Sequence, residues 1–119
     1  MPANKKMVIQ TTQTISAAHY LLHKGPCSRL HGHNWTVTVK ITSEWPECGM
    51  VMDFQRIKEI IKQYDHTTLN QYLHNPTAEN LAILCLEQIQ GECPQGERIT
   101  VTVWESQSSY AKAVYVQEG

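Results

Sequence analysis

Residues 31–42 read His-Gly-His-Asn-Trp-Thr-Val-Thr-Val-Lys-Ile-Thr, and their side chains alternate in character with a period of two. One face of this stretch carries two imidazoles followed by apolar groups: His31, His33, Trp35, Val37, Val39 and Ile41. The opposite face carries Thr36, Thr38 and Lys40. Such alternation is typical of a half-buried β-strand. The stretch therefore predicts a strand in which both histidines point the same way as the core residues.

A strand is also predicted immediately upstream, over residues 8–19, where Thr and Ile are frequent and His19 is the last residue. Residues 21–30 contain a Gly-Pro pair and are predicted to form the connecting loop. Two consecutive strands with a short connection most simply pair antiparallel, so the end of the first lies opposite the start of the second. In that pairing His19 faces His31 and His33.

Two helices are expected after a turn. Asp53 is a good N-cap for a helix over residues 54–64, and Thr77 is the expected cap of a second helix that ends within residues 91–96. Both helices carry an apolar stripe at helical spacing. The stripes are Ile57, Ile60, Ile61 and Tyr64 in the first helix and Leu81, Leu84, Cys85 and Ile89 in the second.

Further strands are expected over residues 97–105 and 110–117, so the order of elements is β-β-α-α-β-β. This order predicts a single α+β domain over residues 1–119, in which two helices cover one face of a four-stranded antiparallel sheet. Four strands leave two open edges rich in Val and Thr, and such edges invite pairing with another subunit. We therefore expect a homo-oligomer.

The charge balance and the cysteines exclude several classes of protein. Ten basic and eleven acidic residues give a net charge of −1, without the basic stripe typical of nucleic-acid-binding proteins. No apolar stretch approaches membrane-spanning length, and the first residues lack the apolar region of a signal peptide. The four cysteines form no CxxC pair, which favours a reducing compartment over a disulfide scaffold. We expect a cytoplasmic protein that binds neither nucleic acid nor membranes.

The three histidines are the strongest functional signal. His-x-His alone is weak, because neighbouring strand histidines occur without metal. Here His19 is predicted in register on the same face as His31 and His33. Three imidazoles can hold a zinc ion and leave one tetrahedral position open, as in catalytic sites. We therefore predict a metal site and favour zinc, although imidazole also suits iron, nickel and copper.

Cys27 lies four residues before His31 and has three interpretations. Its thiol is a small buried hydrophobe, a fourth ligand that closes a structural zinc site, or a catalytic thiolate whose pKa is lowered by nearby metal or cationic groups. The neighbouring Gly25, Pro26 and Ser28 argue against burial in the core. Spacing alone does not separate ligand from catalyst.

Carboxylates supply further candidates. Asp65 and His66 stand in a polar link after the first helix, either as surface residues of a turn or as a carboxylate that orients an imidazole for acid–base catalysis. Glu105 continues the apolar phase of its strand and therefore needs a partner, which is a rim cation or a ligand with adjacent N–H donors. Glu79 is either a first-turn charge that suits the helix dipole or a binding residue.

Six motifs cover nearly the whole chain: Ala17-Ala18-His19, Cys27-Ser-Arg-Leu-His-Gly-His33, Gly49-Met-Val-Met-Asp-Phe54, Asp65-His-Thr-Thr-Leu-Asn70, Asn75-Pro-Thr-Ala-Glu79 and Val103-Trp-Glu-Ser106. Together, in this order, they resemble the 6-pyruvoyltetrahydropterin synthase family, most closely its bacterial 6-carboxytetrahydropterin synthase branch in the queuosine pathway. The resemblance implies the tunnelling fold, or T-fold. It also implies assembly into a hexamer made of two trimers, with active sites between subunits.

The resemblance further implies a zinc-dependent lyase. Its substrate is 7,8-dihydroneopterin triphosphate, and its products are 6-carboxy-5,6,7,8-tetrahydropterin, acetaldehyde and triphosphate. A 6-pyruvoyltetrahydropterin synthase, which eliminates triphosphate with the same set of residues, is one alternative. A non-catalytic module that binds zinc or a pterin is a second one.

The family's site residues map onto positions of this sequence. The implied zinc ligands are His19, His31 and His33. The implied general base is Cys27, and the implied acid–base relay, supplied by a neighbouring subunit, is Asp65 with His66. Glu105 looks like the anchor for the pterin N–H edge, and the pterin pocket is lined in the family at positions that match Thr77 and Glu79.

Overall fold

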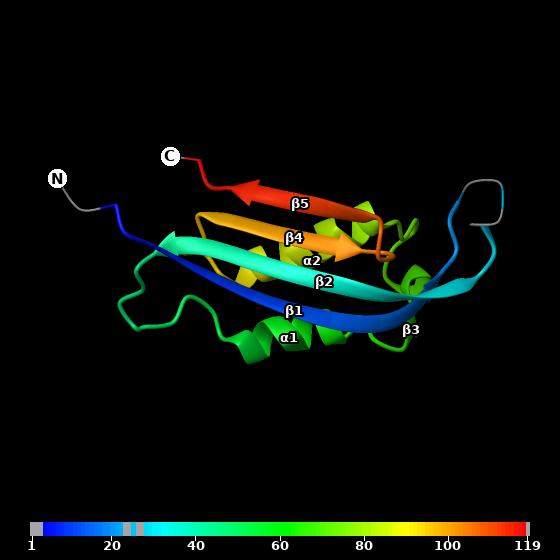
Figure 1. Cartoon of the computed structure of the whole chain (residues 1–119), viewed down its shortest axis with the longest axis horizontal. Coiled ribbons are helices and arrows are strands. Elements are labelled where there is room, and N and C mark those ends of the chain that lie inside the picture. The colour runs from blue at the N-terminus through cyan, green and yellow to red at the C-terminus, as the bar shows by residue number, and fades with distance from the viewer. Residues whose placement is uncertain (1–3, 23–24, 26–27, 119) are drawn as a thin grey trace.

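The two longest strands, β1 (Lys6–His19) and β2 (His31–Glu44), form an antiparallel hairpin in the computed structural model, which describes residues 4–22, 25 and 28–118 (Figure 1). Every residue of β1 pairs with one of β2, from Lys6 opposite Glu44 to His19 opposite His31. The alternation of the sequence predicts this register. It places the inward side chains of both strands on one face.

The sheet has five strands rather than the four expected from the sequence, in the order β3-β1-β2-β4-β5. Strands β4 (Arg98–Trp104) and β5 (Tyr110–Val116) extend it antiparallel from β2, as predicted. The unexpected strand, β3 (Thr67–Thr68), lies in the segment predicted as a polar link and pairs in parallel with β1 at Ala17 and Ala18. Two β-branched threonines suit an extended pair. Their backbone satisfies polar groups of β1 that would otherwise be open.

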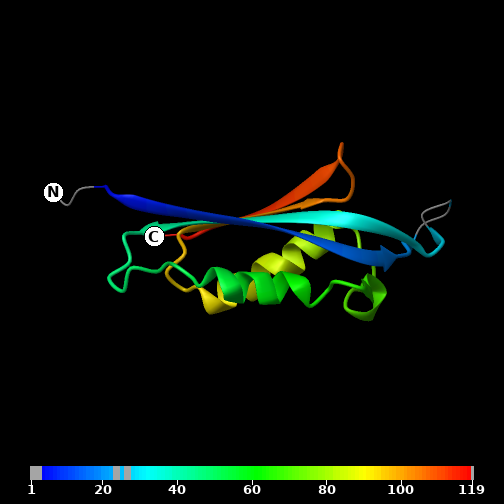
Figure 2. The ribbon, with the colours of Figure 1, turned by 60° about the horizontal axis from the view of Figure 1, so that its bottom comes forward.

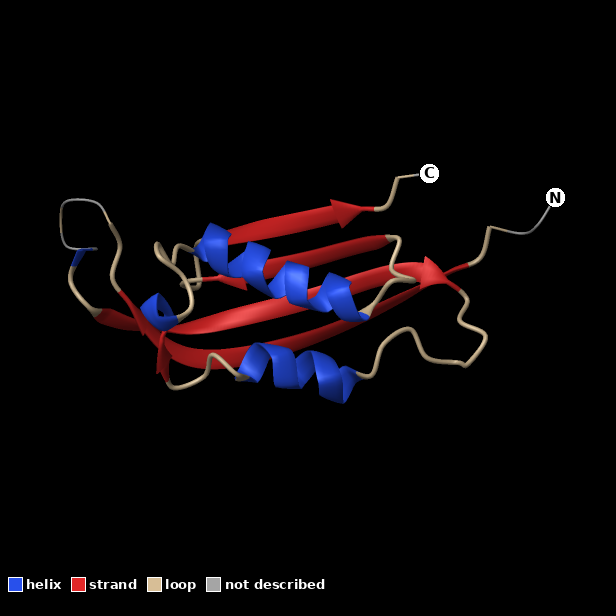
Figure 3. Cartoon of the chain, turned by 180° about the vertical axis from the view of Figure 1, so that it is seen from behind, coloured by secondary structure: helices blue, strands red, loops and turns tan. Residues whose placement is uncertain are grey.

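Both helices cover one face of the sheet, which confirms the predicted two-layer α+β arrangement (Figure 3). Helix α1 (Phe54–Lys62) packs on β1, and α2 (Ala78–Glu92) packs on β4 and β5. A 3₁₀ turn, η2 (Leu69–Gln71), follows β3 directly. In the part of the chain that the structure describes, no element covers the opposite face of the sheet (Figure 2).

The predicted helix caps are confirmed. The carboxylate of Asp53 accepts the Gln55 amide at 2.9 Å, and the Thr77 hydroxyl accepts the Asn80 amide at 3.1 Å. Each bond satisfies one of the free amides at a helix start. The second cap fixes the backbone immediately after Pro76, whose carbonyl contacts the His19 ring.

The core lies between the helices and the sheet and is centred on fully buried Trp35, whose indole N–H donates to the Ala17 carbonyl at 3.1 Å. The predicted stripe of α1 is buried throughout. In α2 the prediction was wrong at one position, because Leu84 is half-buried and Leu86 lies in the core instead. Neither α1 nor α2, the α-helices of the described residues, has the length and apolar character needed to cross a bilayer.

Candidate metal centre

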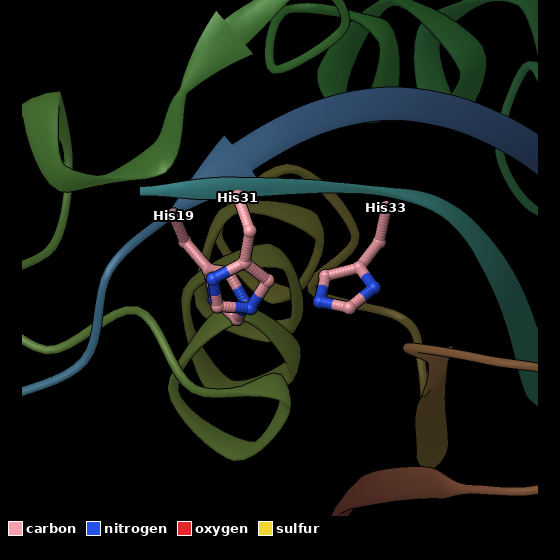
Figure 4. Close-up of side chains that lie close together, drawn as sticks. All are labelled: His19, His31 and His33. Carbon is pink, nitrogen blue, oxygen red and sulfur yellow. The ribbon is translucent and has the colours of Figure 1, made fainter. Parts of the chain in front are cut away.

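Three imidazoles converge where β1 ends and β2 begins. His19 pairs directly with His31, and Ala17 pairs with His33, so the strand period of two puts all three side chains on the helix-covered face. One potential ligand atom from each ring lies within 4.8 Å of the others. Figure 4 shows the three rings turned toward one another. The predicted cluster is confirmed.

Two backbone carbonyls fix the tautomers of two of these rings. The Nδ1 of His19 lies 2.8 Å from the Pro76 oxygen, and the Nδ1 of His31 lies 2.7 Å from the Arg29 oxygen. A carbonyl only accepts, so each Nδ1 must carry the proton and donate it. In the neutral form of each ring, Nε2 then carries a free lone pair, and this is the form that binds a metal.

These two Nε2 atoms lie 3.1 Å apart. Two lone pairs at that separation repel each other unless a proton or a metal ion lies between them. Two nitrogen ligands of a tetrahedral zinc ion, each about 2.0–2.1 Å from the metal, are separated by roughly 3.4 Å. The donor set and the spacing of this pair are therefore compatible with a metal ion such as zinc.

His33 supplies the third nitrogen. Its Nε2 is buried and has no hydrogen-bond partner among the residues that the structure describes. Burial lowers the pKa of His33, and the nearby Glu105 carboxylate opposes this shift only in part. A buried nitrogen without a partner is costly. A metal ion would remove that cost.

Trp35 closes the inner end of the cluster. The ring centroids of His19 and His33 lie 4.9 and 5.3 Å from the Trp35 centroid, with the rings nearly perpendicular. His19 is fully buried, whereas His31 and His33 are half-buried. The cluster thus has an apolar wall on the core side and is open on the other, as a site with a free coordination position requires.

Glu105 lies beside the cluster, although one residue beyond the end of β4 rather than inside the predicted strand. Its Oε1 is 3.8 Å from the His33 Nε2, and its side chain is 36% exposed. Its amide donates to the Ser109 carbonyl at 3.1 Å, which holds the turn between β4 and β5. The carboxylate is therefore accessible from the open side of the cluster.

Asp65 and His66 attach to the outer edge of β1. The Ser16 amide donates to Asp65 Oδ1 at 2.7 Å, and the His66 amide donates to the Ser16 carbonyl at 2.6 Å. The first of these bonds is the main reason that the pKa of Asp65 is below its ordinary value. The segment is therefore anchored to β1, and Asp65 is held as a carboxylate.

The two side chains are poised side by side, with His66 Nε2 3.7 Å from Asp65 Oδ2. The His66 side chain is 83% exposed, and its backbone is left-handed with a φ of 59°. A shallow groove is lined by both His66 and His33. Within one chain, the structure gives the His66 ring no contact with the three-histidine cluster among the described residues.

The structure gives the positions of two more predicted site residues, whose binding roles stay predictions. Thr77 caps α2, and Glu79 is exposed in its first turn. Cys27 lies outside the described residues.

Sequence reasoning missed the carbonyls of Pro76 and Arg29, because a backbone acceptor leaves no signal in residue identity. It also missed the contacts of two asparagines that the motifs include, Asn70 and Asn75. The available signals were the place of Asn70 two residues after β3 and the place of Asn75 before a proline.

Known proteins share both the sequence pattern and the fold. Residues 8–115 match the family model described as 6-pyruvoyl tetrahydropterin synthase. An Archaeoglobus fulgidus protein, provisionally named 6-carboxy-5,6,7,8-tetrahydropterin synthase, is 32% identical over 112 residues, which cover 91% of this chain and 96% of that protein. A Pyrococcus furiosus protein named dihydroneopterin monophosphate aldolase is 35% identical over 81 residues, which cover 64% of this chain and 70% of that protein.

A solved structure confirms the predicted T-fold. The 6-pyruvoyl tetrahydropterin synthase of Caenorhabditis elegans matches this chain with a TM-score of 0.74 at 22% identity. The match covers 99% of this chain and 100% of that one. At this identity the likeness concerns the fold alone.

Proposed function

This chain belongs to the 6-pyruvoyl tetrahydropterin synthase family, and from that premise we propose that it is a zinc-dependent lyase acting on 7,8-dihydroneopterin triphosphate. The products are 6-carboxy-5,6,7,8-tetrahydropterin, acetaldehyde and triphosphate, with one water consumed, and the pathway is queuosine biosynthesis. The observation that carries the proposal is the cluster of three imidazoles, two of them fixed by carbonyls, with nitrogens close enough to share one ion.

His19, His31 and His33 would hold the zinc ion. When bound, zinc supplies Lewis-acid chemistry, which polarises the side-chain oxygens of the substrate. The apolar Trp35 wall excludes water from the inner side of the ligands. Substrate would therefore approach from the side of Glu105.

Cys27 is proposed as the base that removes a proton from the pterin side chain, a role suggested by its position in the Cys27–His33 motif. Asp65 and His66 would complete the proton relay. The Asp65 carboxylate, held by the Ser16 amide, would orient the His66 imidazole and raise its basicity. Because that imidazole is exposed, we propose that it serves the site of a neighbouring subunit in a hexamer of two trimers.

Glu105 is proposed to anchor the substrate by accepting adjacent N–H groups of the pterin ring in bidentate fashion. Its position 3.8 Å from His33 would place the ring next to the metal. Thr77 and Glu79 are proposed to line the same pocket, since Pro76, which precedes them, contacts His19. The proposed location of the enzyme is the cytoplasm.

A second candidate comes from the relative named dihydroneopterin monophosphate aldolase. It would predict carbon–carbon cleavage of a pterin monophosphate, with the same metal and the same pterin anchor. Formation of a 6-pyruvoyl product, and a non-catalytic role in binding zinc or a pterin, are two further candidates that the same experiment separates.

The deciding experiment incubates zinc-loaded protein separately with 7,8-dihydroneopterin triphosphate and monophosphate, and identifies the pterin product by mass. The matched control is His31→Ala, which lacks one of the three proposed zinc ligands. A carboxytetrahydropterin with acetaldehyde supports the proposal. A pyruvoyl product, turnover of the monophosphate alone, or bound zinc without turnover would overturn it in favour of the corresponding candidate.

The variant Cys27→Ala distinguishes whether the Cys27 thiol acts as a base or as a zinc ligand. The proposal requires that this variant keeps its zinc and loses turnover. Loss of zinc would instead identify a closed site of one thiolate and three imidazoles.

A further inference from the structure

His19 is the most constrained of the three histidines. It is the last residue of β1, it is fully buried, and its ring is held at Nδ1 by the Pro76 carbonyl. The chain must leave the strand immediately after it. The peptide bond that follows His19 is therefore one of the backbone groups that set the direction of its Cα–Cβ bond.

That peptide bond is held by a side chain. The Tyr20 amide donates to Asn70 Oδ1 at 3.0 Å, and Asn70 Nδ2 donates to the Tyr20 carbonyl at 2.9 Å. Strand β3 pairs with Ala17 and Ala18 in parallel. The Asn70 carboxamide thus continues this pairing to Tyr20, two residues beyond Ala18, in the place of a backbone peptide, at the point where β3 has turned into η2.

A second asparagine holds the other end of the same segment. Asn75 Oδ1 accepts the Leu22 amide at 3.1 Å, so Tyr20 and Leu22 are both attached to the segment between β3 and α2. The Asn75 carbonyl accepts Asn80 Nδ2 at 2.8 Å and the Thr77 amide at 2.9 Å. These bonds fix the Pro76 carbonyl, which is the partner of the His19 ring.

We propose that Asn70 and Asn75 are positioning residues for the metal centre, with Asn70 the more important. Asn70 holds the peptide after His19, and the Asn75 side chain holds the Leu22 amide beside the turn whose backbone bonds fix the Pro76 carbonyl. The inference rests on the proposed metal site. It concerns how tightly the site is organised before any substrate binds, and outer partners of metal ligands commonly contribute about 10–100-fold to metal affinity.

A purely structural role makes a different prediction. If the asparagines only tie two loops together, removing them lowers the stability of the fold and leaves the intrinsic zinc affinity of the folded protein unchanged. If they position His19, the affinity and geometry of the metal site change in protein that is still folded.

The test compares Asn70→Ala, Asn70→Asp and Asn75→Ala with the unaltered chain. Metal-stripped protein is titrated with zinc against a chromophoric chelator, and with Co²⁺ to record the visible ligand-field spectrum. We expect zinc affinity to fall about 10–100-fold in Asn70→Ala, with a weaker and shifted cobalt spectrum. Asn70→Asp keeps the acceptor for the Tyr20 amide, so a smaller loss is expected, and it remains informative if Asn70→Ala does not fold.

Gln63→Ala is the matched control. It also removes a carboxamide that bonds a backbone carbonyl, that of Ile60 at 2.8 Å, but at the end of α1. Thermal unfolding of the metal-free proteins reports the loss of stability in each variant. Folded Asn70 variants with the zinc affinity and cobalt spectrum of the unaltered chain would overturn the inference, as would equal losses in Gln63→Ala.

Turnover is not a readout of this test, so the two proposals fail separately. Zinc binding that depends on Asn70 in a protein without turnover supports the positioning role and overturns the proposed reaction. An unaltered chain that binds no zinc overturns both.

Discussion

The histidine cluster and the Asp65–His66 pair both lie beside the end of β1, yet they are organised in opposite ways. The cluster is buried or half-buried, carbonyls set the tautomers of two of its three rings, and one wall is Trp35. The pair is anchored only through its backbone and one carboxylate oxygen, and its imidazole faces solvent. One half of the proposed site is thus complete within a chain, whereas the other half is presented outward.

The largest effect is expected from removing a ligand of the histidine cluster. His31→Ala removes one of three ligands, and we expect zinc affinity to fall on the order of 10²–10³-fold, given the binding free energy shared among few ligands. Turnover should fall to background. Metal content after dialysis, measured by atomic absorption, checks this; a variant that retains stoichiometric zinc would contradict the assigned ligand set.

The second prediction concerns a variant that disrupts the Asp65–His66 pair and leaves the histidine cluster intact. His66→Ala should lower kcat by about 10²–10⁴-fold, the usual contribution of a general acid or base, with bound zinc unchanged. Steady-state kinetics and metal analysis of the same preparation check this. Loss of zinc in this variant would show that the two halves are not separate.

Mixing the two inactive variants sharpens the comparison. If His66 serves the site of a neighbouring subunit, co-refolding His31→Ala with His66→Ala regenerates some intact sites, roughly a quarter of them at equal amounts in a closed ring. Activity that stays at background in verified mixed oligomers would place both halves of each site in one chain.

The histidine cluster could be predicted from the amino-acid sequence, because strand geometry determines which side chains share a face. Alternation over residues 31–42 fixes which side chains face inward, and a short hairpin then brings His19 opposite His31. The helix caps Asp53 and Thr77 were predictable as well, because capping depends on local side-chain chemistry.

Several features depend instead on tertiary contacts that no local pattern contains. Strand β3 has only two residues and exists because it pairs with β1. The carbonyls that orient His19 and His31 belong to residues whose identity is irrelevant to the bond. Glu105 was predicted inside a strand but lies just past it, since the alternation continues into the turn.

A moderate effect is expected at the boundary between the two halves. Glu105→Gln should raise KM about 10–100-fold with zinc content unchanged, because a neutral amide cannot accept two N–H groups as a carboxylate does, and charged hydrogen bonds contribute about 1.5–3 kcal/mol. Steady-state kinetics with the pterin substrate checks this. An unaltered KM would remove Glu105 from the pterin pocket.

The smallest effect concerns the anchoring of Asp65. Its folded-state pKa is below the ordinary value of 3.8, so the carboxylate stabilises the fold at neutral pH, and this contribution is lost as the pH falls below 3.8 through the folded-state pKa. Asp65→Asn should therefore lower the Tm of the metal-free protein at pH 7, with the difference from the unaltered chain vanishing in acid. A difference that is constant with pH would show that the charge of Asp65 has no part in it.

At His66 the left-handed backbone opposes the stability of the fold to the proposed acid–base chemistry of the side chain. In this conformation a residue with a Cβ lowers the stability of the fold by about 1 kcal/mol, whereas glycine does not. His66→Gly would therefore be favoured by selection for a sturdier fold and opposed by any selection for proton transfer. The histidine at this position gives up that stability, and the proposed proton relay would account for it.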